Sequence, residues 1–356
     1  MQPNNTIHIC SVGQVGLEIS LHLDGVLDGA EPRVEFQPVG DALDFALAVL
    51  QLGHDATLIG VIGEDTVGKI LRSKLEAVPK LQVHAAPGEE GCCSFPSSSR
   101  TSWNFRLLPD ARSREDDRPT LLRSTSNISL DHLLEDSFTG IFAGADLVHL
   151  IGPFTTSTSR ACALPDRDEL KEGQIPQFPS VREMLTQQEL QMWEALQALI
   201  RRIKERGARV SVDLNYLVLS FGLPRALKSP KDLQRFLDGA DVVFASEFLV
   251  DFAWKGLRKA LHPKRADLTA TLQAGAPYRL VVVEETPATC SGGTCKPGWL
   301  CVKDGEQAQW TPKTPTPREK VLFHAALCAD WAQGVPLKEA VERAARRAED
   351  LATAHP

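Results

Sequence analysis

Residues 56–68 read ATLIGVIGEDTVG, and this stretch carries the most informative local pattern in the chain of 356 residues. The run Ala56–Ile62 is short and largely apolar, which predicts a buried strand. Gly63-Glu64-Asp65 follows as a turn, and the spacing of apolar residues over Val67–Ala77 predicts a helix. A buried strand that turns directly into a helix is typical of α/β proteins with a parallel sheet.

The same alternation of apolar strands and helices extends in both directions from this stretch. Further strands are expected at Thr6–Val12, Leu17–Leu23, Leu147–Gly152, Arg209–Asp213, Val242–Ala245 and Arg279–Val283, and further helices at Ala42–Leu52, Gln187–Arg206 and Pro230–Leu237. This order favours a mostly parallel sheet with right-handed crossover connections.

Three segments depart from the alternation. Residues 24–38 are rich in turn-forming residues and are expected to form a connector. Residues 81–127 contain short alternating segments separated by Ser, Pro and Arg, which predicts a small β element outside the main sheet. Residues 164–186 are polar and contain prolines, so we expect a surface insertion there.

The composition limits the class of protein. Hydrophobic residues make up 43% of the chain and charged residues 24%, as in ordinary globular proteins. The formal net charge of −7 argues against nucleic-acid binding, which needs clustered basic residues. With no apolar run near the ~18 residues of a membrane span and no signal segment, no membrane association and a cytoplasmic location are expected. The cysteines form no CxxC pair and the histidines no HExxH pattern, so no metal site is expected.

Five motifs, taken in chain order, resemble those of the ribokinase/PfkB carbohydrate kinase family, and in particular its 2-keto-3-deoxygluconate kinase and fructokinase-like branch. They are VGQVGLEI (12–19), VGDALDFA (39–46), IGVIGEDTVG (59–68), VDLN (212–215) and QGVPLKEA (333–340). The resemblance implies one ribokinase-like domain over residues 1–356, with a doubly wound, mostly parallel sheet flanked by helices. It also implies a small β lid, formed by about residues 14–38 and 81–127, through which two copies could pair as a homodimer.

The resemblance further implies a substrate pocket for a sugar or another small polar metabolite. Its residues would be Glu18, Gly40, Asp41, Asp44, Asn104 and Arg106. The three carboxylates would disfavour an acidic sugar, so a neutral polyol or a ligand with a cationic group fits better. Two alternatives stay open. Asp41 also stands where it could cap the helix 42–52, and Asn104 and Arg106 could be ordinary surface residues of the lid.

The motif that would transfer phosphate is altered. Counted back from Gln333, Val321 falls where the family carries its catalytic aspartate, and a valine cannot accept a proton. Arg318, Glu319 and Lys320 replace the small residues whose backbone N–H groups would hold the transferred phosphate. The sequence therefore predicts that both the base and the anion-binding turn are missing.

The rest of the nucleotide site is altered as well. Glu284 stands at the family's Thr-x-Gly turn, where a carboxylate would repel a polyphosphate. Glu247 lies in SEFL, the counterpart of a magnesium-organising Asn-x-x-Glu segment, whose terminal acid is here a leucine. Asp213 and Asn215 retain the expected strand end, although the arginine that would follow is absent.

These departures predict a pseudokinase. Such a protein would bind a sugar or metabolite, or act as a scaffold for a protein partner, with no cofactor. The alternative is an active, divergent carbohydrate kinase that uses Mg-ATP and a different base, either His324 or an acid supplied by another loop. A second alternative is an ATP-independent reaction in the sugar pocket.

Overall fold

The structure is a computed structural model that describes residues 6–23, 31–86, 88–89, 101–108, 120–124, 127–152, 154–156, 181–215, 234–246, 272–273, 276, 279–285, 298–312 and 316–354. Within these ranges, nine strands form the main sheet in the order β16-β15-β14-β13-β12-β10-β1-β4-β5. Their bounds are β1 His8–Gly13, β4 Asp55–Val61, β5 Leu81–Ala86, β10 Leu147–Gly152, β12 Arg209–Asp213, β13 Val242–Ser246, β14 Leu280–Glu285, β15 Gly298–Lys303 and β16 Glu306–Trp310.

The strands from β14 to β5 in this order run parallel, and β15 and β16 add an antiparallel hairpin at one edge. In the register of the central strands, Ile9 on β1 lies opposite Ala56 on β4 and Leu147 on β10. The mostly parallel α/β sheet expected from the alternating pattern is thus confirmed.

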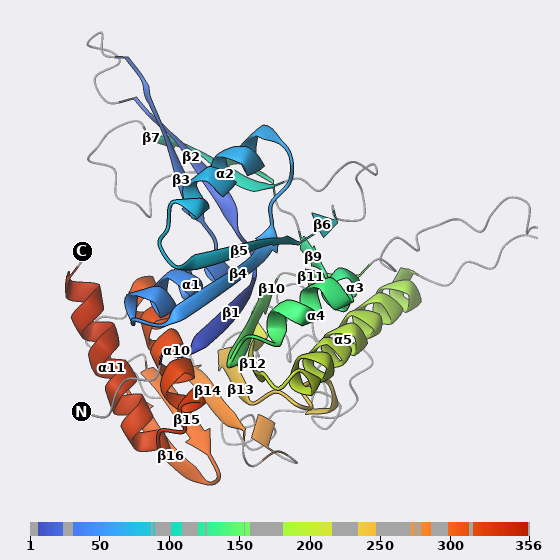
Figure 1. The fold of residues 1–356 in the computed structure, drawn as a ribbon, viewed down its shortest axis with the longest axis vertical. Coiled ribbons are helices and arrows are strands. Elements are labelled where there is room, and N and C mark those ends of the chain that lie inside the picture. The colour runs from blue at the N-terminus through green and yellow to red at the C-terminus, as the bar shows by residue number, and fades with distance from the viewer. Residues whose placement is uncertain are drawn as a thin grey trace, which may run out of the picture.

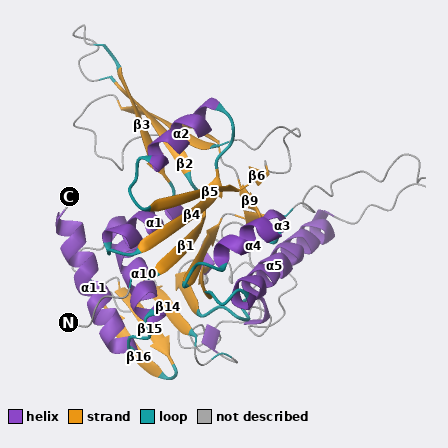
Figure 2. Cartoon of the chain, in the orientation of Figure 1, coloured by secondary structure: helices purple, strands orange, loops and turns teal. Residues whose placement is uncertain are grey.

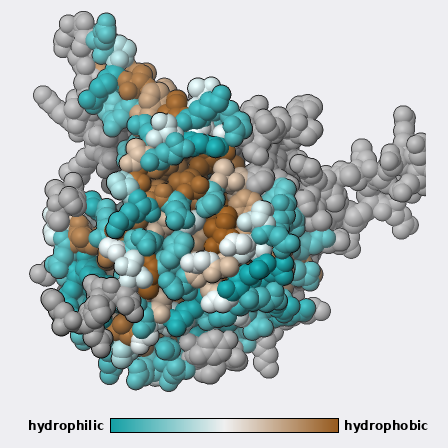
Figure 3. All heavy atoms as spheres, viewed as in Figure 1, coloured by the Kyte–Doolittle hydropathy of each residue, from teal (hydrophilic) through white to brown (hydrophobic). Residues whose placement is uncertain are grey.

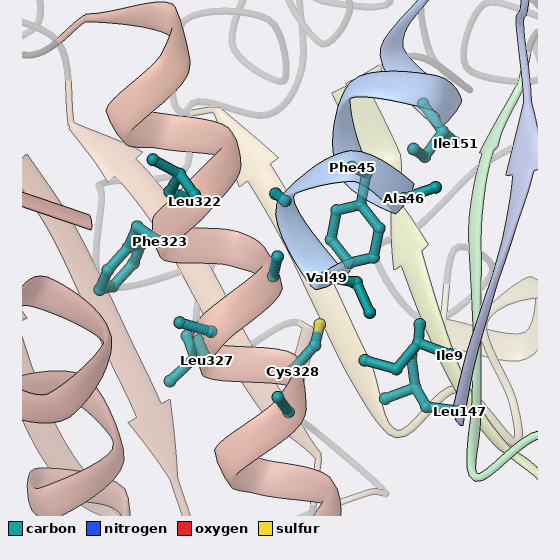
Figure 4. Close-up of a cluster of buried hydrophobic side chains, with 14 of the residues drawn as sticks. Ile9, Phe45, Ala46, Val49, Leu147, Ile151, Leu322, Phe323, Leu327 and Cys328 are labelled. Carbon is teal, nitrogen blue, oxygen red and sulfur yellow. The ribbon is translucent and has the colours of Figure 1, made fainter. Parts of the chain in front are cut away.

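Helices cover both faces of the sheet (Figures 1 and 2). One face carries α1 Asp41–Gln51, α2 Thr66–Glu76, α10 Pro317–Ala332 and α11 Leu337–Ala354. The other carries α3 Leu130–Leu133, α4 Asp136–Phe142 and α5 Val181–Glu205. Because successive strand residues point to opposite faces, Ile9 belongs to the first core and Cys10 to the second. Figure 4 shows the first core where α10 packs against α1 and the central strands.

A separate four-stranded sheet projects from the end of the main sheet (Figure 1). It has the order β3-β2-β7-β8, with β2 Gly16–His22, β3 Arg33–Val39, β7 Ser102–Leu108 and β8 Thr120–Ser124. We call it the small sheet. Three shorter strands form another sheet, namely β11 Phe154–Thr155, β9 Asn127–Ser129 and β6 Gly88–Glu89.

Several expected boundaries are wrong. Residues 33–38, expected in a connector, belong to strand β3. Leu81–Ala86, expected in the small β element, pairs with β4 in the main sheet. Residues 181–186, expected in the surface insertion, begin the long helix α5. Residues 24–30, 90–100 and 164–180 lie outside the described residues, so the expectations for those parts stay predictions.

The surface differs between the two parts of the molecule. Figure 3 shows hydrophobic side chains on the small sheet and below α2, whereas the outer sides of α5 and α11 are mainly hydrophilic. Val34 on β3 is 49% exposed. Among the described helices, none combines the length and the hydrophobicity that crossing a membrane requires.

Candidate functional site

The larger of two neighbouring cavities lies where the carboxyl ends of the parallel strands meet the N-termini of α1 and α10. This is the edge at which α/β sheets usually place their ligands. The cavity has a volume of about 420 Å³. It is lined by Asp41, Phe45, His149, Ile151, Asp213, Glu284, Trp299, Thr316, Pro317, Lys320, Val321 and His324.

At the N-terminus of α10, beside this cavity, two backbone N–H groups are hydrogen-bonded to side chains of the same helix end. The backbone N–H of Glu319 donates to Oγ1 of Thr316 over 3.1 Å, and the Glu319 carboxylate accepts from the backbone N–H of Thr316 over 2.7 Å. Pro317, the first helical residue, has no N–H to offer. Two backbone donors that could otherwise meet an anion are therefore bonded within the helix itself.

The second turn of α10 places an ion pair and an aliphatic side chain beside the cavity. Nζ of Lys320 lies 2.6 Å from Oε2 of Glu284 at the end of β14, and both side chains are about one-third exposed or less. Val321, one residue further on, also lines the cavity. The Lys320 ammonium is thus already neutralised by a carboxylate.

Two buried histidines form part of the cavity wall. The ring of His324 stacks on Phe244 with the ring centroids 4.0 Å apart, and Nε2 of His324 is buried without a hydrogen-bond partner. Burial, together with the nearby Lys320 ammonium and His149, holds the pKa of His324 well below its usual value. The ring of His149 packs against Phe45, tilted by 30° with the centroids 4.0 Å apart, and its Nδ1 lies 2.9 Å from Oγ of Ser211. Burial lowers the pKa of His149 to about 3, so both rings are neutral near pH 7.

The smaller cavity, about 350 Å³, lies between the main body and the small sheet. Five residues expected in the substrate pocket line it, namely Glu18, Gly40, Asp41, Asn104 and Arg106. Oε2 of Glu18 lies 3.0 Å from Nε of Arg106 on the adjacent strand. This pairing offsets the Glu18 charge on which the expected exclusion of acidic sugars partly rested. Asp41 lines both cavities.

The first turn of α1 contains three of the predicted residues. Gly40 is the N-cap, with a positive φ of 133°, and a side chain there would overlap the carbonyl oxygen of Gln14. Asp41 is the first helical residue, so the expectation that its side chain caps the helix is wrong. Asp44 is exposed and does not appear among the described residues that line either cavity.

The remaining predicted residues have different surroundings. Asp213 lines the larger cavity, and its carboxylate accepts from the backbone N–H of Asn215 over 2.9 Å. Asn215 in turn accepts from the backbone N–H of Ser246, which ties the ends of β12 and β13 together. Arg318 is half-buried on the first turn of α10. Glu247 lies outside the described residues.

Sequence reasoning did not place Thr316, His149 or Trp299 in the wall of the larger cavity. Thr316 and Glu319 form the sequence pattern Thr-x-x-Glu of a capping box, which the residue types alone could have indicated. His149 and Trp299 carry no local signal, because only the pairing of distant strands brings them to this cavity. Within the described ranges, no three His, Cys, Asp or Glu side chains are grouped as a metal site requires.

No protein-family model matches the chain. Over 70 residues, which are 19% of this chain, the sequence is 36% identical to fructosamine kinase FrlD of Bacillus subtilis (strain 168). The match spans only 25% of the length of that protein.

Solved structures resemble the chain over nearly its whole length. The PfkB protein from Polaromonas sp. JS666 has a TM-score of 0.58 at 14% identity, over 99% of this chain and 97% of that one. The apo adenosine kinase of Trypanosoma brucei brucei has a TM-score of 0.58 at 12% identity, over 97% and 98%. Arabidopsis thaliana ribokinase complexed with ribose and ATP has a TM-score of 0.52 at 14% identity, over 96% and 91%. At these identities the likeness establishes a shared fold.

Proposed function

From the ribokinase-like fold that this chain shares with PfkB carbohydrate kinases, we propose that it binds a small polar metabolite without transferring phosphate to it. The supporting observation is the N-terminus of α10, where a capping box bonds the backbone donors of Thr316 and Glu319. An anion at a helix N-terminus needs such donors free. A transferred phosphate group of Mg-ATP therefore does not fit the residues present here.

The charges beside α10 support the same proposal. Glu284 pairs with Lys320 over 2.6 Å, so a phosphate would have to displace a carboxylate to reach the ammonium. Val321 lines the cavity at the position expected for the base and cannot accept a proton. Loss of a general base alone costs about 10²–10⁴-fold in rate, whereas loss of preorganised charge stabilisation removes a further large share of catalysis.

The base that the sequence suggested for an active kinase, His324, lies in the cavity wall. Its pKa is lowered by burial, by Lys320 and by His149, so its imidazole is a weak base near pH 7. The binding proposal is therefore favoured over a kinase that uses His324. No described feature distinguishes a scaffold role from metabolite binding, and the expected homodimer, protein partner and cytoplasmic location stay predictions.

The test combines binding with turnover. Thermal denaturation is followed with Mg-ATP, with Mg-ADP and with ribose, fructose, glucose, sorbitol and a fructosamine, the last because of the matched FrlD segment. A ligand at about 100 times its Kd should stabilise the fold by about 2.7 kcal/mol, which raises Tm by several degrees. We expect such a shift with at least one sugar or polyol, none with either nucleotide, and no sugar-dependent release of ADP.

The variant Val321→Asp makes the test sharper. It restores a carboxylate at the position of the base but leaves the capping box and the Lys320–Glu284 pair in place. We expect Val321→Asp to remain as inactive as the unaltered chain. Sugar-dependent ADP release by the unaltered chain would overturn the proposal. ADP release by Val321→Asp alone would show that the phosphate site is intact, which contradicts the argument from α10.

A further inference from the structure

Lys320 and Glu284 form an acid–base pair that a molecule in the larger cavity can reach. Nζ of Lys320 lies 2.6 Å from Oε2 of Glu284, and the two side chains keep 33% and 26% of their surfaces exposed. Both residues line the larger cavity. Among the described residues, Lys320 is the only lysine that lines either cavity. An amine and a carboxylate at this separation can exchange a proton directly.

Regular elements of the fold hold both members of the pair in place. The backbone N–H of Lys320 donates to the carbonyl oxygen of Thr316 over 3.1 Å, directly after the capping box of α10. Glu284 lies on β14 between two paired strands, opposite Ser246 on β13 and Trp299 on β15. A pair fixed by a capped helix and an interior strand is already oriented when a ligand arrives, which lowers the entropic cost of a reaction there.

The arrangement suits a ligand that carries a carbonyl group. A lysine amine adds reversibly to an aldehyde or a ketone, and it needs a neighbouring group that removes and returns protons. Three carboxylates line the cavity, those of Asp41, Asp213 and Glu284, so a carbonyl compound with an additional acidic group is disfavoured. The cavity volume of about 420 Å³ leaves room for a small molecule beside Lys320.

We propose that Lys320 forms an imine with a small, uncharged aldehyde or ketone, and that Glu284 transfers the protons. The Lys320 ammonium first gives one proton to the Glu284 carboxylate. The amine nitrogen then bonds to the carbonyl carbon, and the carbonyl oxygen takes the proton from Glu284. A second proton passes from the nitrogen through Glu284 to the new hydroxyl group, which leaves as water while the C–N double bond forms. The net reaction converts an ammonium and a carbonyl into a protonated imine and water, and it needs no oxidant.

Lys204 provides the matched control within the same chain. It pairs with Asp241 over 2.9 Å and its side chain is 39% exposed, but it is not among the described residues that line either cavity. A lysine that reacts with carbonyl compounds only because it is accessible should behave as Lys204 does. The inference rests on the proposed function, because it treats the larger cavity as a metabolite site without phosphate transfer.

The test traps the imine and locates it. The chain is incubated at pH 8 with glyceraldehyde or dihydroxyacetone and with cyanoborohydride, which reduces an imine to a stable secondary amine, and peptide mapping by mass spectrometry gives the labelling of each lysine. We expect Lys320 to be labelled about tenfold faster than Lys204, at a rate that saturates with the carbonyl compound. With glyceraldehyde 3-phosphate, the anionic counterpart, this ratio should fall. Equal labelling rates at the two lysines would overturn the proposal.

Two variants separate proton transfer from accessibility. Glu284→Gln keeps a polar side chain of the same size but cannot take up the proton, so labelling of Lys320 should fall about tenfold. If Lys320 were only accessible, the loss of its ion pair would speed its labelling, and such a rise would contradict the role of Glu284. Lys320→Arg keeps a cation beside Glu284 but forms no imine. It should melt at the same temperature as the unaltered chain and show labelling only at the remaining lysines.

Failure of this inference and failure of the proposed function give different results. Binding of a sugar or polyol, together with equal labelling of Lys320 and Lys204, would overturn the imine and leave the proposed function standing. Sugar-dependent ADP release would instead overturn the proposed function.

Discussion

Helix α1 borders both cavities. On this helix, the surrounding structure shifts the pKa of Asp44. It lies one turn after Asp41 on α1. Partial withdrawal of its carboxylate from water, and then repulsion by Asp41, raise the pKa of Asp44 from 3.8 to about 6, although the residue keeps an exposed surface. The folded protein therefore takes up this proton at a higher pH than the unfolded chain does.

This shift predicts a pH dependence of stability. Because the folded pKa is raised, lowering the pH from 7 towards 4 should favour the folded state through Asp44. Asp44→Asn removes the titrating group, so the unaltered chain should gain Tm relative to Asp44→Asn as the pH falls through about 6. Thermal denaturation at several pH values measures this difference, with Glu76→Gln, an exposed position on α2, as the control. A Tm difference that is constant over this range would contradict the prediction.

The sequence alone locates some residues of the site but not others. Val321 can be located by counting back from Gln333, and the structure puts it on the cavity wall next to Lys320. His149 and His324 stand 175 positions apart in the numbering and both contact the ring of Phe244 only because β10, β13 and α10 pack together. Proximity of this kind depends on tertiary packing and leaves no local pattern in the sequence.

At the level of elements, the turn after β4 joins the main body to the small sheet. Asp65 is the N-cap of α2, and its carboxylate accepts from the backbone N–H groups of Gly68 (2.6 Å) and Thr101 (2.9 Å). Thr101 immediately precedes β7, and its hydroxyl accepts from the backbone N–H of Gly63 over 2.9 Å. Gly68 has no room for a side chain, because a Cβ atom there would overlap the carbonyl oxygen of Gly63.

The connection between α2 and β7 should lose stability when the Asp65 carboxylate is removed. Asp65→Ala removes a helix cap and a second backbone bond, so we expect the free energy of unfolding to fall by about 2 kcal/mol. Chemical denaturation measures the loss. Glu64→Ala is the matched control, since Glu64 forms an exposed ion pair with Arg72 and should change stability by less than about 0.5 kcal/mol. An equal loss of unfolding free energy in the two variants would show that the Asp65 hydrogen bonds do not stabilise this connection.

Strands could be predicted from the sequence where burial on both faces requires a run of apolar residues. The apolar strands β1, β4, β10, β12, β13 and β14 are buried on both faces, and their runs were visible in the sequence. Strand β3 was missed, because it is an edge strand that contains Pro38 and in which no residue is fully buried. The hairpin partner β16, Glu306–Trp310, was missed for the same reason, since an edge strand with exposed side chains shows little hydrophobic alternation.

On the scale of the whole molecule, α10 connects the cavity to the core. Residues 322–330 of this helix are buried without interruption, because α1, α11 and the sheet surround it (Figure 4). A helix that is apolar on all sides is buried on all sides. Its C-terminal part is held by Asp330, which pairs with Arg343 and Arg347 of α11. The cavity wall at its N-terminus therefore shares the stability of the core.

The alkylation rates of three buried cysteines can show whether the molecule unfolds as one cooperative unit. Cys10 lies in the central strand β1, Cys301 in the hairpin strand β15 and Cys328 in α10. Burial raises the pKa of all three thiols, that of Cys328 to about 12. Since alkylation requires the thiolate and access to it, none should react while the fold is closed.

We expect iodoacetamide at pH 8 to modify Cys10, Cys301 and Cys328 at one common rate, that of global unfolding. Peptide mapping by mass spectrometry separates the three positions, and labelling in concentrated urea gives their rates in the unfolded chain. The reason for a common rate is that the two cores share the central sheet, so opening one face exposes the strands of the other. Faster modification of Cys301 than of Cys10 would mean that the edge hairpin β15–β16 opens by itself. In that case the Trp299 side of the larger cavity would be mobile while the α10 side stays closed, because Trp299 lies on β15.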